Sequence, residues 1–277
     1  MLHISKTFLF STLICLMYSC ESDSEQAPNV TIPKDTHCPG NITDATPTEN
    51  LDVLVWADEF DTDGFPCPKN WEAQIGNGQW GWGNGEIQYY TRENANVSNG
   101  ILSITAKKEA YRGAQYTSAR IITKNKFDFT YGRVEVRAKL PAGEGTWPAI
   151  WLLGSDYLSN IWPRCGEIDI MEQKGWDKKT TLGTCHWFQG DKPAQYSLNR
   201  RVTTSTSDFH VYALEWTRSS IKMFVDDKQY YSMSLNKNMP FDNDFFIILN
   251  VAVGGTLGGT SIEANLESSM EIDYVRV

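Results

Sequence analysis

The sequence predicts an all-β protein built as a two-sheet β-sandwich of jelly-roll type. Short apolar runs with strand character recur from Leu51 to the end of the chain, and turn residues separate them. No stretch carries the repeat of a convincing helix, and no internal repeat is visible. About ten strands in one domain indicate two packed sheets.

The clearest strand covers 131–140. Its small and apolar residues alternate with charged or aromatic ones, so one face is apolar and the other is polar. Asp226-Asp227 interrupts another apolar run and predicts a hairpin turn there. Similar strand-like runs cover 101–106, 117–124, 147–153, 166–172, 181–187, 208–216, 220–231, 244–253 and 270–277.

Composition excludes several classes of protein. The 277 residues hold 25 Lys and Arg against 34 Asp and Glu, a net charge of −9, which argues against nucleic acid as a partner. The hydrophobic content of 41% is enough for one globular core. Aromatic residues reach 12% and include ten Trp, which is unusual and directs attention to stacking surfaces.

Residues 1–19 are predicted to be a lipoprotein-type signal peptide. An apolar run covers 8–17, too short to span a bilayer, and Ser19-Cys20 follows it. Cys20 is then the lipidated N-terminus of an exported protein, held at the outer membrane of a Gram-negative bacterium. Ordinary secretion is the alternative. Residues 20–50 are rich in Pro, Thr, Asp and Asn and predict a flexible linker, which leaves 51–277 as the catalytic domain.

Cysteine usage fits export. Four cysteines remain beyond Cys20, an even number that allows three pairings in an oxidising compartment, although free thiols fit equally well. A bridge between Cys38 and Cys67 would tie the linker to the domain. No His or Cys spacing resembles a zinc site. The other two cysteines are Cys165 and Cys185.

The segment from Gly166 to Glu172 carries three carboxylates. In a regular strand Glu167 and Asp169 share one face, while Glu172 faces the opposite side and enters the apolar core. An unpaired carboxylate there is very costly. A one-residue β-bulge near Ile170-Met171 returns Glu172 to the face of the other two. The segment therefore predicts three carboxylates in a row on one strand face.

This arrangement suits glycoside hydrolysis. Two Glu side chains leaning together bring their carboxyls to about 5 Å, the separation of a retaining rather than an inverting glycosidase. One Glu would attack the anomeric carbon and the other would protonate the leaving oxygen. Asp169 between them would hydrogen-bond the nucleophile and raise the proton affinity of the acid. When the glycosyl-enzyme forms, one negative charge disappears and the acid becomes a base for water.

A solvated acidic strand face is the alternative interpretation, but adjacent like charges destabilise a strand that does not use them. The surrounding Trp residues favour a sugar site, because flat aromatic walls suit the C–H faces of sugar rings. A Gly- and Trp-rich loop at 78–85 adds to them. Core packing is the alternative for each Trp, and is expected for Trp56 and Trp216. The Trp residues close to the acidic segment are Trp147, Trp151, Trp162 and Trp187.

Six segments resemble glycoside hydrolase family 16, specifically its laminarinase-like endo-β-1,3-glucanases. They occur in order, and the resemblance covers 51–277. Met171 is similar to the extra residue of the family's bulged branch, which includes laminarinases and several marine-polysaccharide enzymes. The matching segments are WADEF at 56–60, NGEIQYY at 84–90, YGRVE at 131–135, GTWPAIW at 145–151, GEIDIME at 166–172 and NVAVGG at 250–255.

The resemblance implies a jelly roll with an open cleft on its concave face. It assigns Glu167 as the nucleophile, Asp169 as the assisting carboxylate and Glu172 as the general acid/base. It places Trp147, Trp151 and His186 at the point of cleavage. On the glycone side it places Asn84, Arg133, Trp162 and Asn250.

The resemblance also implies a structural calcium ion on the convex face. The matching positions are Glu59 and Gly100, through backbone oxygens, and Asp273. Hard oxygen ligands suit calcium. Capping of an edge strand is the alternative role for Asp273. No cofactor is expected for catalysis.

The leading function is therefore a retaining endo-β-1,3-glucanase acting on laminarin-type glucans, with mixed-linkage β-1,3-1,4-glucan as a second substrate. The same mechanism on agar, porphyran or carrageenan is one alternative. A glucan-binding protein without catalysis is another, although such relatives generally lack the acidic pair present here. Expected partners are β-glucan chains, with membrane contact only through lipid at Cys20. An open-cleft enzyme of this kind is expected to be a monomer.

Overall fold

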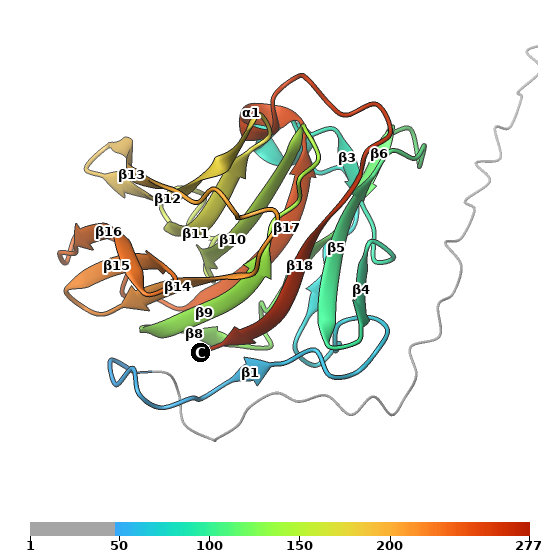
Figure 1. The fold of residues 1–277 in the computed structure, drawn as a ribbon. Coiled ribbons are helices and arrows are strands. Elements are labelled where there is room, and N and C mark those ends of the chain that lie inside the picture. Colours follow the sequence, from blue (N-terminus) through green and yellow to red (C-terminus); the bar gives the residue numbers. More distant parts are fainter. Residues whose placement is uncertain (1–47) are drawn as a thin grey trace, which may run out of the picture. The chain divides into compact units, whose positions relative to one another are not determined.

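The structure, a computed structural model, describes residues 48–277. The signal peptide, Cys20, Cys38 and the linker up to residue 47 lie outside the described residues. The described part is an all-β sandwich of two large sheets, as the sequence predicts (Figure 1). No helix within residues 48–277 is long and apolar enough to cross a membrane.

One sheet, called here the β9 sheet, has ten strands. Its order is β16-β15-β14-β9-β18-β5-β6-β3, with β1 paired to β18 and β4 paired to β5. All its pairs are antiparallel except β3 with β6. The strands are β1 (Ala57–Asp58), β3 (Gln88–Tyr90), β4 (Ala95–Ser98), β5 (Ile101–Lys107), β6 (Tyr116–Ser118), β9 (Gly132–Lys139), β14 (His210–Trp216), β15 (Ser220–Val225), β16 (Lys228–Ser234) and β18 (Glu267–Arg276).

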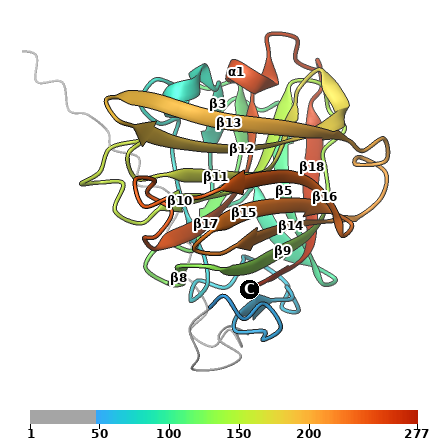
Figure 2. The same cartoon turned by 90° about the vertical axis from the view of Figure 1, so that its left-hand side faces the viewer.

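The other sheet, called here the β11 sheet, has eight strands and is antiparallel throughout. Its order is β13-β12-β11-β10-β17-β7-β2, with β8 paired to β17. Figure 2 shows its strands layered against those of the β9 sheet. The strands are β2 (Glu72–Ala73), β7 (Arg120–Ile122), β8 (Asp128–Phe129), β10 (Thr146–Gly154), β11 (Glu167–Lys174), β12 (Asp177–Gln189), β13 (Lys192–Arg201) and β17 (Phe245–Val253).

The core lies between the two sheets and follows the predicted alternation. On β9, Val134, Val136 and Ala138 are fully buried while the residues between them are half-buried. Trp56 and Trp216 are core residues, as expected, with 1% and 0% of their surface exposed. Burial of this apolar surface is the main stabilising contribution to the sandwich.

The hairpin turn at Asp226-Asp227 is confirmed, since both residues have positive φ between β15 and β16. The predicted strand 117–124 is instead two strands, β6 and β7, which belong to different sheets. A ten-residue strand, β13, was not predicted. Its residues are mostly polar on both faces, and pairing along its length with β12 holds it in the sheet.

Two short helical turns also depart from the prediction. One is α1 (Gly255–Gly258), and the other is a kinked turn, η1 (Gly81–Gly85). Both are too short and too Gly-rich to show a helical apolar repeat. Among the cysteines, Cys165 and Cys185 are free and buried, whereas Cys67 takes part in a disulfide.

Candidate active site

The predicted β-bulge is present in β11. Against β10, Met171 pairs with Ile150 and Asp169 pairs with Trp151, so Ile170 is the extra residue. Against β12 the register also shifts between Asp169 and Glu172. Ile170 and Met171 both enter the core, each with 0% exposure. The sequence interpretation is confirmed: an apolar pair turns inward and the Glu after it returns to the outer face.

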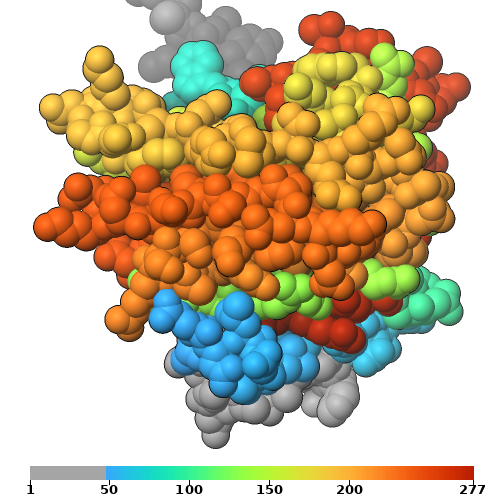
Figure 3. Space-filling view, turned by 60° about the vertical axis from the view of Figure 1, so that its left-hand side comes forward, coloured from blue at the N-terminus to red at the C-terminus, as the bar shows by residue number. Residues whose placement is uncertain are grey.

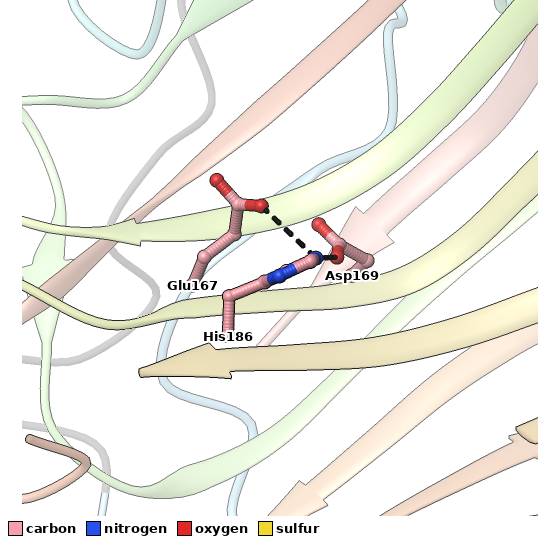
Figure 4. Close-up of side chains that lie close together, drawn as sticks. All are labelled: Glu167, Asp169 and His186. Atoms are coloured by element: carbon pink, nitrogen blue, oxygen red, sulfur yellow. Dashed lines mark ion pairs between the residues drawn. The ribbon is translucent and has the colours of Figure 1, made fainter. Parts of the chain in front are cut away.

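Three side chains meet on that outer face, two from β11 and one from β12 (Figure 4). His186 Nε2 lies 3.6 Å from Glu167 Oε1 and 3.4 Å from Asp169 Oδ2. Glu167 and His186 are register partners, which explains why their side chains face each other. No Lys or Arg in the part of the chain described forms an ion pair with either carboxylate.

Burial controls the protonation of this cluster. Desolvation raises the pKa of Glu167 well above its ordinary value, the charge of Asp169 raises it further, and His186 opposes the shift. The pKa of Asp169 is raised well above its ordinary value by burial and then by Glu172. Burial and the repulsion between these carboxylates therefore both favour their protonated forms.

Glu172 is held by a tryptophan from the neighbouring strand. Trp147 Nε1 donates a hydrogen bond of 2.9 Å to Glu172 Oε1. Burial raises the pKa of Glu172, and the Trp147 hydrogen bond opposes that rise. The hydrogen bond fixes the direction of the carboxyl group, and its raised pKa favours the protonated form that a general acid requires.

These carboxylates lie on the floor of a cleft of about 510 Å³. The cleft extends from β11 across β10 and β17 to β7 and the η1 turn. Its walls are largely aromatic, which suits sugar rings. Lining residues among the predicted set are Glu167, Asp169, Glu172, Asn84, Trp147, Trp151, Trp162 and Asn250.

A chain of hydrogen bonds orders the far side of the cleft. Trp151 Nε1 donates to Asn250 Oδ1 at 2.8 Å, and Asn250 Nδ2 donates to the Tyr90 hydroxyl at 3.1 Å. The Tyr90 hydroxyl donates in turn to Glu86 Oε2 at 2.9 Å. Asn84 Nδ2 donates to the other oxygen of Glu86 at 3.3 Å. Glu86, Tyr90 and Asn250 are buried, so their hydrogen bonds hold Asn250 and its partner Trp151 in one orientation.

Glu86 was not among the predicted site residues. A signal existed: Glu86, Gln88 and Tyr90 alternate along the chain and carry polar groups on one face. All three are buried, with 8%, 0% and 0% exposure. Such a row of buried polar side chains indicates an ordered network rather than a solvated edge.

The structure does not bring Arg133 to the cleft. Arg133 lies on β9, in the other sheet, where it pairs with Glu135 at 2.7 Å and with Glu215 at 2.8 Å. The alternation along β9 correctly gives Arg133 an outward face, but that face is the outside of the β9 sheet. Its predicted role in binding sugar is therefore corrected.

Arg120 occupies the cleft instead. Its guanidinium lies between two aromatic rings, 4.7 Å from the ring centre of Trp82 and 4.8 Å from that of Trp151. The Nε atom is buried without a hydrogen-bond partner in the structure. Gly78 makes room for Trp82, since a Cβ at position 78 would lie 2.6 Å from the Trp82 ring. The signal for Arg120 is a charge placed directly between Ala119 and Ile121 in the strand-like run at 117–124.

His186 and Trp162 lie side by side, with ring centres 5.7 Å apart. Half of the Trp162 surface is exposed, so its face remains available to a ligand. The sequence-predicted set therefore converges on one site, with Arg133 as the exception among the candidate sugar-binding residues.

Of the three candidate calcium residues, Asp273 lies on β18 of the β9 sheet, and Glu59 and Gly100 directly flank other strands of that sheet. Asp273 is the extra residue where β18 shifts its register against β9. Along β18, the pairing with β5 ends where Ile272 faces Leu102. The pairing with β1 begins further along the strand, where Val275 faces Asp58. Gly100 directly precedes β5 and Glu59 directly follows β1, so the two residues flank this gap in the pairing of β18. Two backbone carbonyls and one carboxylate match the oxygen donors that calcium prefers.

Among the residues described, one group of side chains has metal-ligand spacing. Glu167, Asp169 and His186 place one ligand atom each within 4.8 Å of the others. The same atoms form the carboxylate cluster on the cleft floor.

Comparison with known proteins gives a consistent result. Residues 83–276 match the family described as Glycosyl hydrolases family 16. The Beta-glucanase of Rhodothermus marinus is 46% identical over 243 residues, which cover 81% of this chain and 84% of that protein.

Solved structures of other proteins are similar to this chain in fold and in sequence. A variant of LamA from Zobellia galactanivorans, in complex with laminaritriose and laminaritetraose, matches with a TM-score of 0.78 and 42% identity, covering 82% of this chain and 98% of the other. The laminarinase from Rhodothermus marinus matches with a TM-score of 0.74 and 45% identity, covering 80% of this chain and 95% of the other.

Proposed function

This chain belongs to glycosyl hydrolase family 16, and we infer that it is an endo-β-1,3-glucanase that cleaves internal bonds of laminarin-type glucans. The observation that carries the inference is the bulged β11 strand. It presents Glu167, Asp169 and Glu172 together on the floor of a cleft walled by tryptophans. The relatives reported above act on, or were solved with, β-1,3-glucan fragments.

We propose a retaining double displacement. Glu167 attacks the anomeric carbon while Glu172 donates its proton to the departing glycosidic oxygen, so the C–O bond of the substrate breaks as the glycosyl–Glu167 ester forms. Burial raises the pKa of Glu172, which favours the protonated form that donates. The Trp147 hydrogen bond aims the carboxyl group.

The second displacement reverses these roles. Esterification removes the charge of Glu167, so Glu172, now ionised, accepts a proton from water as the water attacks the anomeric carbon. The ester bond breaks and Glu167 leaves as a carboxylate. Asp169 and His186 stabilise that carboxylate in turn, one by sharing a proton and the other through its ring nitrogen.

The glycone part of the chain would bind across β10, β17 and β7. The guanidinium of Arg120 lies between the rings of Trp82 and Trp151. Its N–H groups could donate hydrogen bonds to the hydroxyls of a sugar that stacks on these rings. Asn84 and Asn250 add amide groups held by Glu86 and Tyr90. Trp162 would add an exposed aromatic face on the glycone side, and the neighbouring His186 would contact the sugar at the cleavage point.

A product assay on residues 48–277 tests the function. The substrates are laminarin, mixed-linkage glucan, agarose, porphyran and carrageenan, with reducing ends and oligomer sizes followed over time. Early release of mixed-size oligomers from laminarin, with β-anomers formed first by NMR, is the expected result. Activity confined to a galactan would overturn the substrate, and initial α-anomers would overturn the retaining mechanism. Binding of laminarin without hydrolysis would support a glucan-binding protein instead.

We also propose a structural calcium ion held by the Glu59 and Gly100 carbonyls and the Asp273 carboxylate. The support is the gap between β1 and β5 beside the Asp273 bulge. Arg137 hydrogen-bonds the Asp273 carboxylate and would share it with the ion. Calcium should raise the thermal midpoint by mass action. Chelation should lower it, and Asp273→Ala should remove that response; an unchanged midpoint in both would contradict the site.

We further propose that the protein is exported as a monomer anchored by lipid at Cys20, with secretion as the alternative. The support is the apolar run that ends in Ser19-Cys20. Fractionation of cells that express the full chain should place the wild type with membranes and Cys20→Ala with the soluble fraction. Equal partitioning of the two would contradict the anchor.

A further inference from the structure

The bulge that carries the catalytic residues lies opposite a second bulge in the other sheet. In β16, Gln229 pairs with Phe224 and Tyr231 pairs with Met223, so Tyr230 is the extra residue of that strand. β16 and β13 are edge strands of the two sheets and contact each other. Figure 3 shows this face of the molecule, crossed by yellow-orange and orange bands from this part of the chain. Because of its bulge, β16 turns both Tyr230 and Tyr231 toward the interior.

A hydrogen bond joins the two bulges. The Tyr230 hydroxyl donates to the Ile170 carbonyl at 2.5 Å. Ile170 has no register partner on β10 or on β12, so its backbone lies outside the regular ladder. A buried carbonyl that has lost its hydrogen bonds to water and has no donor in the protein is unfavourable. Tyr230 supplies that donor from the other side of the core.

The path of Tyr230 depends on a glycine in the catalytic sheet. Gly183 on β12 lies between Thr184 and Leu182, the partners of Asp169 and Glu172, so it faces the bulge directly. A Cβ at Gly183 would lie 2.6 Å from the Tyr230 hydroxyl and 2.6 Å from Met223 Sδ. The absence of a side chain at this position leaves room for the hydroxyl to reach Ile170.

Burial keeps the Tyr230 hydroxyl protonated, since desolvation raises its pKa well above the ordinary value. It therefore remains a donor across the working pH range. The groups that face it are Ile170 and Gly183 of the β11 sheet and Met223 of β15, while Asp169 and Glu172 lie near enough to raise its pKa further.

We propose that Tyr230, with Gly183, is a positioning residue that clamps the β11 bulge and so sets Glu172 at the correct place relative to Glu167. This role rests on the proposed function. The bulge decides whether Glu172 faces the cleft. Ile170 is the residue of the bulge that has no register partner in the sheet, and Tyr230 holds its carbonyl. Misplacement of an acid/base group by about 1 Å reduces the rate by about 100-fold.

Tyr230→Phe removes the donor and little else. It should lower kcat on laminarin by about 10–100-fold. KM should stay within about twofold, because the sugar-binding residues lie on other strands. The basic limb of the pH–rate profile should also move, since the surroundings of Glu172 change. Gly183→Ala, which crowds the same hydroxyl, should show the same division between kcat and KM.

A substrate with a good leaving group makes the test specific. Dinitrophenyl β-laminaribioside needs no proton from Glu172, so its kcat/KM reports attack by Glu167 alone. Tyr230→Phe should leave this kcat/KM within about threefold of wild type while laminarin hydrolysis falls. Tyr230→4-aminophenylalanine, which keeps an N–H donor at the same place, should recover laminarin hydrolysis.

Tyr231→Phe is the matched control. Tyr231 is the next residue on β16, and its hydroxyl also donates to a carbonyl across the sandwich, that of Tyr196 on β13, at 3.2 Å. Equal kcat values for Tyr230→Phe and Tyr231→Phe would overturn the clamp. Equal losses on both substrates would show general damage instead and overturn it too.

The proposed substrate can be wrong while the proposed role of Tyr230 is right. If the wild type cleaves another polysaccharide, the variants are compared on that polymer, and the same division between kcat and KM is expected. A folded Gly183→Ala with unchanged kcat would contradict the clamp whatever the substrate.

Discussion

The outer faces of the two sheets carry the same kinds of residue but differ in how charge is balanced. On the β9 sheet, Lys139 pairs with Glu271 at 2.9 Å and Arg133 pairs with Glu135 and Glu215. On the β11 sheet, Glu167 and Asp169 have only His186 at ion-pair distance among the residues described. Charged side chains alternate along both faces, so alternation alone does not separate them.

Burial adds to the contrast. The side chains of Glu135 and Glu215 are 28% and 26% exposed, against 16% and 6% for Glu167 and Asp169. Carboxylates that are paired and wet stabilise a surface slightly. Carboxylates that are buried together, with a single histidine as their ion-pair partner, raise one another's pKa, and such perturbed groups are typical of functional sites. The comparison teaches that the balance of charge, rather than its presence, marks the functional face.

The largest effect is expected from removing the nucleophile. Glu167→Ser should reduce laminarin hydrolysis by about 10,000-fold or more, because no ester can form. Binding of laminari-oligosaccharides, measured by calorimetry, should remain. The control is Glu135→Ser, an outward carboxylate of the other sheet, which should leave the rate unchanged. Wild-type turnover in Glu167→Ser would contradict the assignment.

Removing the acid/base group should have a smaller effect. Glu172→Gln is expected to lower kcat/KM on laminarin by about 100–10,000-fold, the range of general acid catalysis. Its kcat/KM on dinitrophenyl β-laminaribioside should be nearly unchanged, since that leaving group needs no proton. A loss that is equal on both substrates would assign Glu172 a different role.

The two arginines allow a direct test of the corrected prediction. Arg120→Ala should raise KM for laminari-oligosaccharides about 10-fold or more, because a hydrogen bond from a charged donor is worth about 1.5–3 kcal/mol. Arg133→Ala should leave KM unchanged, since Arg133 lies outside the cleft. Steady-state kinetics of both variants test this prediction. A raised KM in Arg133→Ala with an unchanged KM in Arg120→Ala would return Arg133 to the sugar-binding site.

The unpaired carboxylates should weaken the fold at neutral pH. A raised pKa means that the folded state holds its proton more tightly than the unfolded state, so the stabilising contribution of Asp169 is complete below about its ordinary 3.8 and is lost as pH rises through the folded pKa.

Asp169→Asn removes the ionisable group and, with it, the stability lost when Asp169 ionises. Its free energy of unfolding should exceed that of the wild type by about 0.5–2 kcal/mol at pH 7, the usual gain from one stabilising substitution. The gain should shrink toward pH 4. Urea titrations across pH measure it, and a gain that grew toward acid pH would reverse the sign of the argument about burial.

The smallest effect is expected on the balanced face. Arg133→Ala should lower the free energy of unfolding by about 1 kcal/mol or less, because each of its pairs is near the surface. Added salt should reduce the difference between variant and wild type. A salt-independent loss of several kcal/mol would show that these pairs matter more than their exposure suggests.

Much of the site was predictable from residue order. Two apolar residues between Asp169 and Glu172 require a bulge, because the alternative buries a carboxylate in the core. The structure has that bulge at Ile170. Trp147, Trp151 and Trp162 were recognisable because aromatic residues cluster around the acidic segment, and all three line the cleft.

Other features depended on where the strands lie in space. The run 117–124 divides between two sheets, and only its second half, with Arg120, reaches the cleft. The pairing of Tyr230 with Ile170 joins residues 60 positions apart from opposite sheets. No local pattern encodes such a contact.

The sequence by itself determined the all-β fold, the three carboxylates and the need for a bulge, because alternation and the cost of buried charge act over a few neighbouring residues. The tertiary structure decided which outward face is the cleft. It put Arg120 rather than Arg133 beside the sugar site and brought Tyr230 against the catalytic strand. The alternation of residues along a strand predicts which side chains point outward. Only the packing of the two sheets decides whether that outer face lines the cleft or the solvent.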